Sequence, residues 1–288
     1  MTFLIQVLRI SGPYGLAALA GTFSELGGVV NIALEGILLS GALGATLATH
    51  WTGNPWIGIL AGIGAGMLLS CLHAWAALRH RVDQIVSSLA CNFLAAGLCR
   101  FILKLVFHST SNSSRVEGLP DWGGLDPFLV LFFVIVGLCQ WIVYRTRFGL
   151  RLRAVGEHPQ AAESLGISVL AMRFKGVLLS GALAGLGGAW LALEQHQFTD
   201  GMSGGRGYIA LAAVILGRWT PLGAAGAALF FGLAESLQII LQAYGVRVPT
   251  QFVQMLPYLM TLAAVAGVAG KSRPPAADGI PYSSEQDR

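Results

Sequence analysis

The sequence predicts an all-α fold, a bundle of transmembrane helices with about eight spans and one short broken segment. Composition is the basis of this fold class. Of the 288 residues, 55% are apolar and only 11% are charged, and the mean hydropathy is +0.67. A soluble domain carries roughly 25% charged residues, so the charges here are too few to cover a water-exposed surface. The 38 glycines are typical of helices that pack closely within lipid.

Eight apolar segments have about the 20 residues that a helix needs to cross the hydrocarbon core. Arg9 and Pro13 interrupt the first, which could instead be a signal peptide, but no small-residue cleavage site precedes a soluble domain. The stretch Tyr208–Leu216 is too short to span alone and completes a crossing only with its flanks. The eight predicted spans are Phe3–Ser24, Asn31–His50, Pro55–Leu78, Gln84–Phe107, Pro127–Tyr144, Lys175–Glu194, Leu222–Gln242 and Gln251–Gly270.

Arginines and lysines concentrate in three short segments, Arg79 to Arg81, Arg145 to Lys175 and Lys271 to Arg273. Basic loops face the cytoplasm, and with all three on that side the spans alternate consistently if Tyr208–Leu216 and its flanks complete one crossing. The polar loop 109–126 and the N-terminus then lie outside. No basic run is long enough for a nucleic-acid-binding face, so the expected surroundings are membrane lipid.

The chain divides into a membrane domain, residues 1–271, and a cytoplasmic tail, residues 272–288. The tail is rich in proline, serine and charge without apolar periodicity, and we expect it to be disordered. The membrane domain includes the long basic loop at about 145–174.

A short internal repeat links two glycine-rich breaks. Residues 28–34 (GVVNIAL) match residues 205–211 (GRGYIAL) in spacing and in the shared Ile-Ala-Leu, and each copy opens an apolar helix. Interrupted helices at corresponding places in two halves indicate a transport site near the midplane of the bilayer. In a sequence this rich in Ala, Gly and Leu, a chance match is equally compatible with the data.

The basic loop contains a predicted helix of about two turns. Pro159 suits its first turn, Ala161 and Ala162 its interior, and Gly166 its end. So short a helix is unstable alone in water. It is expected either to dock on a partner or on its own membrane domain, or to be an ordinary connection.

Four segments together resemble one family. Residues 28–36 (GVVNIALEG), 83–92 (DQIVSSLACN), 153–167 (RAVGEHPQAAESLGI) and 207–217 (GYIALAAVILG) look like permease subunits of bacterial ABC importers. The most similar branch is that of nucleoside and simple-sugar permeases, relatives of the ribose and branched-chain amino-acid permeases. The resemblance implies a multi-pass protein of the bacterial cytoplasmic membrane that translocates a small polar solute, with a nucleoside as the first choice and a simple sugar as the second.

The resemblance also implies partners. These are an ATPase subunit that binds the ATP, a second permease of the same or a different sequence, and an extracytoplasmic solute-binding protein. In such permeases the short cytoplasmic helix contacts the ATPase and couples it to transport. By resemblance, this role falls on Gly156, Glu157, Pro159, Ala161, Ala162, Gly166 and Ile167.

The chain itself has no predicted catalytic, cofactor or metal site. Residues 265–272 (VAGVAGKS) superficially resemble a phosphate-binding loop, but Val265 replaces its first glycine and Pro274 prevents the helix that should follow. The histidines and the four cysteines show no metal-ligand spacing. We therefore predict that the protein is not an enzyme.

Polar residues inside apolar spans are the candidates for a translocation pathway, because a charge at the bilayer centre costs roughly 3 kcal/mol or more. For each one alone, helix-to-helix bonding is more common than solute contact. The candidates are Asn31, Glu35, Asn92, Arg206, Tyr208 and Glu235.

The alternative is a transporter or channel driven by an ion gradient, in which Glu35 or Glu235 would carry protons. Such a protein has no reason to contain the segment 153–167. A membrane-embedded enzyme would need a polar catalytic cluster, which the sequence lacks.

Overall fold

The computed structural model describes residues 3–120, 126–243 and 273–282, together with scattered positions between 255 and 267. Within these residues the regular structure is helical, apart from one isolated β-bridge, which confirms the all-α class. The long helices are α1 (Phe3–Leu26), α2 (Leu34–Thr52), α3 (Pro55–Ala74), α4 (Gln84–Phe107), α5 (Pro127–Arg145), α8 (Val169–Glu194) and α10 (Pro221–Ala243). The short ones are α6 (Arg147–Glu157), α7 (Pro159–Ser164), α9 (Arg206–Leu216) and the π-helical turn Trp75–Arg79 that continues α3.

Six of the described helices are long and apolar enough to cross a membrane, namely α1, α3 with its π-helical turn, α4, α5, α8 and α10. Helix α2 has 19 residues but carries Glu35 and His50 at its ends, and it is not among the six. The prediction of about eight spans is therefore close, and its span Gln251–Gly270 falls almost wholly outside the described residues.

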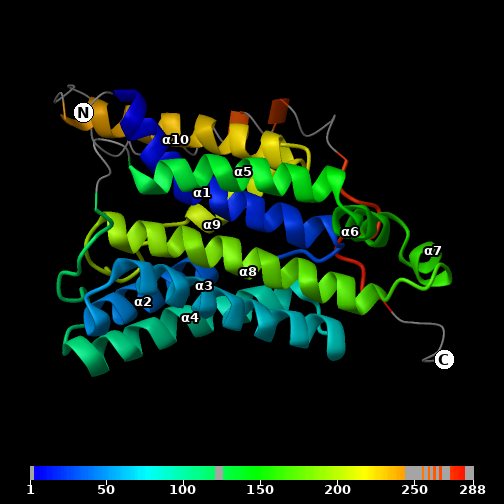
Figure 1. Ribbon diagram of the computed structural model, residues 1–288, viewed down its shortest axis with the longest axis horizontal. Helices are drawn as coiled ribbons and strands as arrows, with labels where there is room; N and C mark the ends of the chain where they lie inside the picture. The colour runs from blue at the N-terminus through cyan, green and yellow to red at the C-terminus, as the bar shows by residue number, and fades with distance from the viewer. Residues whose placement is uncertain are drawn as a thin grey trace.

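The long helices lie side by side, with α8 between two groups (Figure 1). On one side of α8 lie α1, α5 and α10, and on the other lie α2, α3 and α4; α8 packs directly on α1, α2 and α3. Helices α6 and α7 and the segment 273–282 lie at one end of the bundle, and the N-terminus lies at the other. The basic loops gather at the end with α6 and α7, which is the end that the sequence predicts to face the cytoplasm.

Glycines let the central helices approach until their backbones touch. A Cβ at position 66 of α3 would lie 2.4 Å from the carbonyl oxygen of Gly181 in α8. A Cβ at position 188 of α8 would lie 2.0 Å from the carbonyl oxygen of Leu38 in α2. Close packing of this kind stabilises membrane helices because lipid supplies no hydrophobic driving force between them.

Several helices begin where the sequence predicts because a side chain caps the first turn. The Asn54 and Asp126 side chains accept hydrogen bonds at 2.9 Å from the amides of Trp56 and Phe128, and in each case a proline follows the cap. Asp83 caps α4 in the same way, with both Ile85 and Val86 as donors.

Candidate functional site

The first functional region is a break in the helical structure before α2, at residues 27–33, which we call the broken segment. It begins in the left-handed conformation, with Gly28 at φ +82°. Inside a membrane, unwound backbone must find partners within the protein. The Val30 amide donates to Gln84 Oε1 of α4 at 2.8 Å, and the Ser24 hydroxyl donates to the Val29 carbonyl at 2.6 Å.

Two asparagines complete this support. Asn31 is fully buried; its Oδ1 accepts from the Ala33 amide and its Nδ2 donates to Ser180 Oγ of α8, both at 3.1 Å. Asn92 of α4 accepts from the Gly36 amide at 2.8 Å and donates to the Ile32 carbonyl at 3.0 Å. These amides therefore hold the broken segment and the first turn of α2 in place.

Glu35 joins the two broken helices. Its Oε1 accepts from the Gly205 amide and its Oε2 from the Gly207 amide, each at 2.8 Å, so the carboxylate sits on the N-terminus of α9. A carboxylate there satisfies free amides and complements the helix dipole. Gly207 is required for the approach, because a Cβ at that position would lie 2.3 Å from the Glu35 nitrogen.

An ion pair holds the start of α9 from its other side. Arg206 Nη2 lies 2.6 Å from Glu235 Oε1 of α10, and both side chains are largely shielded from solvent. The guanidinium also lies 5.6 Å from the centre of the Tyr14 ring of α1. A partly buried cation is stabilised by such a carboxylate and ring face.

Five of the six predicted pathway residues therefore meet around the N-terminus of α9, and Asn31 lies deeper, at the broken segment. Most of them bond helix to helix. Tyr208 differs, because 45% of it is exposed while its hydroxyl accepts from Asn92 Nδ2 at 3.2 Å. Sequence reasoning missed Gln84 and Ser180; the first lies in the family-like stretch 83–92, and the second carries no sequence signal.

The internal repeat is reflected in part in the backbone. Gly28 and Gly205, its first residues, adopt nearly the same left-handed conformation, with φ of +82° and +84°. The helices then begin at different places, because α9 starts at Arg206 whereas α2 starts only at Leu34. Glu35 follows the first copy directly and binds amides of the second.

The second candidate region is the pair α6 and α7 in the predicted cytoplasmic loop, which we call the docking helices after their predicted role. Helix α6 was not anticipated, although Phe148, Leu152 and Val155 recur at helical spacing between arginines. Leu152 and Val155 are buried under the membrane helices. A Cβ at position 156 would lie 2.2 Å from the Leu26 carbonyl oxygen, so the end of α6 rests on the end of α1.

Helix α7 matches the predicted two-turn helix, from Pro159 to Ser164. Gly166 ends it at φ +77°, and the Ile167 amide donates back to the Ala162 carbonyl at 3.1 Å. The predicted coupling residues divide between two faces. Gly156, Pro159 and Ala162 are buried, Ile167 is half-buried, and Glu157, Ala161 and Gly166 are exposed. The exposed tip also includes Leu165, at 80%, which the sequence prediction omitted.

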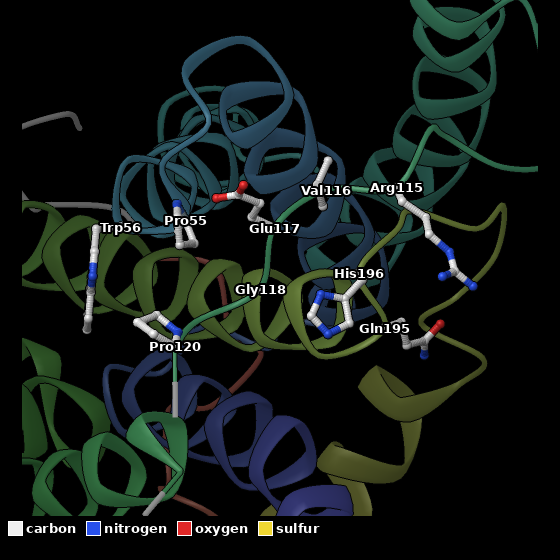
Figure 2. A pocket seen from close by; sticks show the side chains of 9 residues that line it. All are labelled: Pro55, Trp56, Arg115, Val116, Glu117, Gly118, Pro120, Gln195 and His196. Atoms are coloured by element: carbon white, nitrogen blue, oxygen red, sulfur yellow. The ribbon is translucent and has the colours of Figure 1, made fainter. Parts of the chain in front are cut away.

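The opposite end of the molecule carries a hollow of about 830 Å³ (Figure 2). The loop after α4 and the segment after α8 form part of its wall and are joined by backbone hydrogen bonds from Ser113 to Phe198 and from Val116 to His196. Figure 2 shows the Trp56 ring at one side and the Arg115 side chain at the other. Its lining residues are Pro55, Trp56, Arg115, Val116, Glu117, Gly118, Pro120, Gln195 and His196.

Within the described part of the chain, no group of three or more His, Cys, Asp or Glu side chains is arranged to hold a metal ion. The four cysteines are unbridged, and three of them are buried. Neither functional region described above contains a nucleophile beside a base.

The family profile and the most similar relatives in the comparison with known proteins agree on one family. The profile described as "Branched-chain amino acid transport system / permease component" matches residues 3–265. The chain is 39% identical to the guanosine ABC transporter permease protein NupQ of Bacillus subtilis, over 97% of this chain and 98% of the relative. It is also 39% identical to the nucleoside ABC transporter permease protein NupC of Lactococcus lactis, over 96% and 95%. A solved structure, described as a metal-chelate type ABC transporter in an inward-facing conformation, matches with a TM-score of 0.52 at 17% identity, over 91% and 84% of the two chains, which supports the fold alone.

These findings and the six apolar helices make the chain a multi-pass protein of the inner membrane. Its relatives are permease components and not enzymes. This chain belongs to the family described as the permease component of the branched-chain amino acid transport system, and it is a permease subunit of an ABC transporter.

Proposed function

We propose that this chain is the membrane subunit of an importer for nucleosides, driven by an ATPase that is a separate protein. The solute class is supported by the two relatives that match almost end to end, which are named as guanosine and nucleoside permeases. A second permease subunit completes the pathway, and an extracytoplasmic binding protein delivers the solute. A simple sugar is the second candidate for the solute.

The observation that carries the ATP-driven function is the form of the docking helices. Helix α7 has six residues and projects beyond the membrane helices (Figure 1). Leu165, the residue directly after it, is exposed to water. Exposing Leu165 is unfavourable in water but stabilising in the groove of a partner. We assign Glu157, Ala161 and Leu165 to the contact with the ATPase, and we assign Gly156, Pro159 and Ala162 to the attachment of the docking helices to this chain.

The same geometry supplies a route for movement. Because Gly156 rests on the end of α1, a displacement of α7 is passed to the broken segment that follows α1. ATP binding would then favour one arrangement of the broken helices and ATP release the other, which requires a differential affinity of the ATPase for the two arrangements. Tyr208 would contact the solute, because it is the most exposed polar side chain of the cluster around α9.

The extracytoplasmic hollow is the proposed seat of the binding protein. It lies at the end where solute arrives, and its charged side chains Arg115 and Glu117 are exposed. Rim charges of this kind select and orient a partner more than they add affinity.

Affinity purification of the tagged chain in mild detergent tests the proposal. We expect an ATPase to co-purify with the wild type in a fixed ratio, and Leu165→Ser to lower that ratio at least fivefold, because the leucine is the apolar anchor. The matched control is Leu150→Ser on α6, which replaces another leucine that is more than half exposed and should leave the ratio unchanged. The binding protein and second permease are scored in the same eluate.

A wild-type chain that binds no ATPase, but accumulates solute in liposomes on an ion gradient, would contradict the proposal. Equal loss of ATPase in both leucine variants would show that α7 is not the docking element.

A further inference from the structure

The segment 273–282 follows a defined path across the cytoplasmic end of the bundle. Its composition predicts disorder, yet two turns shape it, with the Asp278 amide donating to the Pro275 carbonyl at 3.0 Å and Ile280 to Ala277 at 3.3 Å. Gly279, at φ +74°, permits the second turn. In Figure 1 this segment, drawn in red, passes beside α6.

A buried arginine fixes this segment. Arg173 of α8 is 1% exposed, and it donates from Nη1 to the Ile280 carbonyl at 2.8 Å and from Nη2 to the Ala277 carbonyl at 3.3 Å. Its guanidinium also lies 5.9 Å from the centre of the Tyr282 ring. A buried cation without acceptors is strongly unfavourable. The carbonyls of Ala277 and Ile280 thus supply hydrogen-bond acceptors for this buried guanidinium.

The segment also bonds to both docking helices. The Ala277 amide donates to the Gly156 carbonyl at 2.8 Å, and the Ala276 amide donates to Glu157 Oε2 at 3.3 Å. At its far end the Tyr282 hydroxyl donates to the Glu163 carboxylate of α7. The proposed function places Glu157 at the ATPase interface and assigns Gly156 to the attachment of the docking helices to this chain.

On its inner side the segment touches the broken segment before α2. A Cβ at Gly28 would lie 3.0 Å from the Ala277 carbonyl oxygen and 2.9 Å from Arg173 Nη2. A Cβ at Gly279 would lie 3.4 Å from Val30 Cγ2. Residues 273–282 therefore add a bridge between two regions that also meet directly, since a Cβ at Gly156 would lie 3.4 Å from the Gly28 nitrogen.

We propose that residues 273–282 are a strap that ties the docking helices to the broken segment, with Arg173 as the residue that positions it, so that movement of α7 is transmitted to the pathway. This inference rests on the proposed function. A six-residue helix has little rigidity of its own, and coupling between distant sites is carried by networks of packed and hydrogen-bonded groups. The strap adds such contacts at both regions.

The strap should loosen as pH rises. Burial raises the pKa of Asp278 from 3.8 to about 7, although Arg173 of α8 lowers it; the Glu25 carboxylate of α1 faces the same group. The docked strap thus binds a proton more tightly than a free one, so its docking is strongest below about pH 4 and weakens as pH rises through 7. A spin label at Ile280→Cys should be more mobile at pH 8.5 than at pH 5.5, and Asp278→Asn should flatten this dependence. If the spin label responded equally to pH with and without Asp278→Asn, the role of Asp278 in docking the strap would be contradicted.

The coupling ratio tests the strap directly. The complete transporter, with its ATPase, is reconstituted in liposomes, and uptake of radiolabelled guanosine and ATP hydrolysis are measured together. We expect deletion of residues 273–288 to lower the amount of solute moved per ATP at least fivefold. The milder substitutions Tyr282→Phe and Arg173→Gln should lower the same ratio by less. In all three variants the rate of ATP hydrolysis should stay within twofold of the wild type. Lys175→Gln, an exposed cation two residues from Arg173, is the matched control and should match the wild type.

The readout separates coupling from stability, because unfolded protein lowers uptake and hydrolysis in proportion and leaves their ratio unchanged. A ratio equal to the wild type in the deletion and in Tyr282→Phe would overturn the strap. If the wild-type chain bound no ATPase, that result would instead contradict the proposed function, and the proposed role of the strap would fail with it.

Discussion

Glu35→Ala should lower guanosine uptake more than tenfold and reduce the thermal stability of the purified complex. The Glu35 carboxylate is the acceptor for the amides of Gly205 and Gly207, both at 2.8 Å. Each buried donor left without an acceptor costs about 1–3 kcal/mol, and about 1.4 kcal/mol is tenfold in an equilibrium. Without the carboxylate, the amides of Gly205 and Gly207 have no hydrogen-bond acceptor in α2. Uptake in liposomes and thermal unfolding in detergent measure the two effects.

Glu35→Gln distinguishes this structural role from proton transport. The glutamine carbonyl can still accept from one of the two amides, so uptake should lie between that of the wild type and that of Glu35→Ala. A residue that carries protons would be inactivated as completely by glutamine as by alanine. Equal and complete loss in both variants would therefore contradict the capping role.

Gly66→Ala should prevent stable assembly of the bundle. The added methyl group of α3 would lie 2.4 Å from the Gly181 carbonyl oxygen and 2.6 Å from the Gly185 Cα of α8. Both neighbours are backbone atoms, which cannot move aside as a flexible side chain can. Overpacking a core typically costs about 1–3 kcal/mol, and we expect a loss of about 3 kcal/mol here. Size-exclusion chromatography and thermal unfolding in detergent measure the loss.

Gly64→Ala is the matched control in the same helix. A Cβ at position 64 meets no atom within 4 Å, so the variant should purify in wild-type yield. Helices prefer alanine to glycine by about 1 kcal/mol in water, so a small gain in stability is compatible with the interpretation. Equal yields of the two variants would show that the contact between α3 and α8 tolerates an extra methyl group.

Local sequence signals predict much of the helical architecture. The predicted span Gln84–Phe107 has the same bounds as α4, because Asp83 caps its start and the apolar run sets its length. Pro159 and Gly166 marked the ends of α7 for equally local reasons. Apolar length, proline and glycine act within a few residues, which is why a sequence reveals them.

The pairings between distant elements could not be predicted in this way. Glu35 was selected as a charge in an apolar span, but nothing local indicates that it binds amides 170 residues later in the chain. The path of the strap left no sequence signal for a related reason. Its three prolines and its lack of apolar periodicity predict disorder, whereas backbone carbonyls that accept from Arg173 fix its position. Contacts made by backbone atoms leave little trace in residue type.

The fastening of the broken segment also constrains how the protein is made. A ribosome releases the broken segment and Glu35 long before their hydrogen-bond partners, since Gln84 follows Val30 by 54 residues and Gly205 follows Glu35 by 170. Unpaired backbone is strongly unfavourable in hydrocarbon, so we expect the segment between α1 and α2 to reach its final arrangement only after α4, and finally α9, have been made. Folding of this subunit is therefore completed late. In a chain truncated before α9, the Glu35 carboxylate would lack the amides of Gly205 and Gly207 that donate to it.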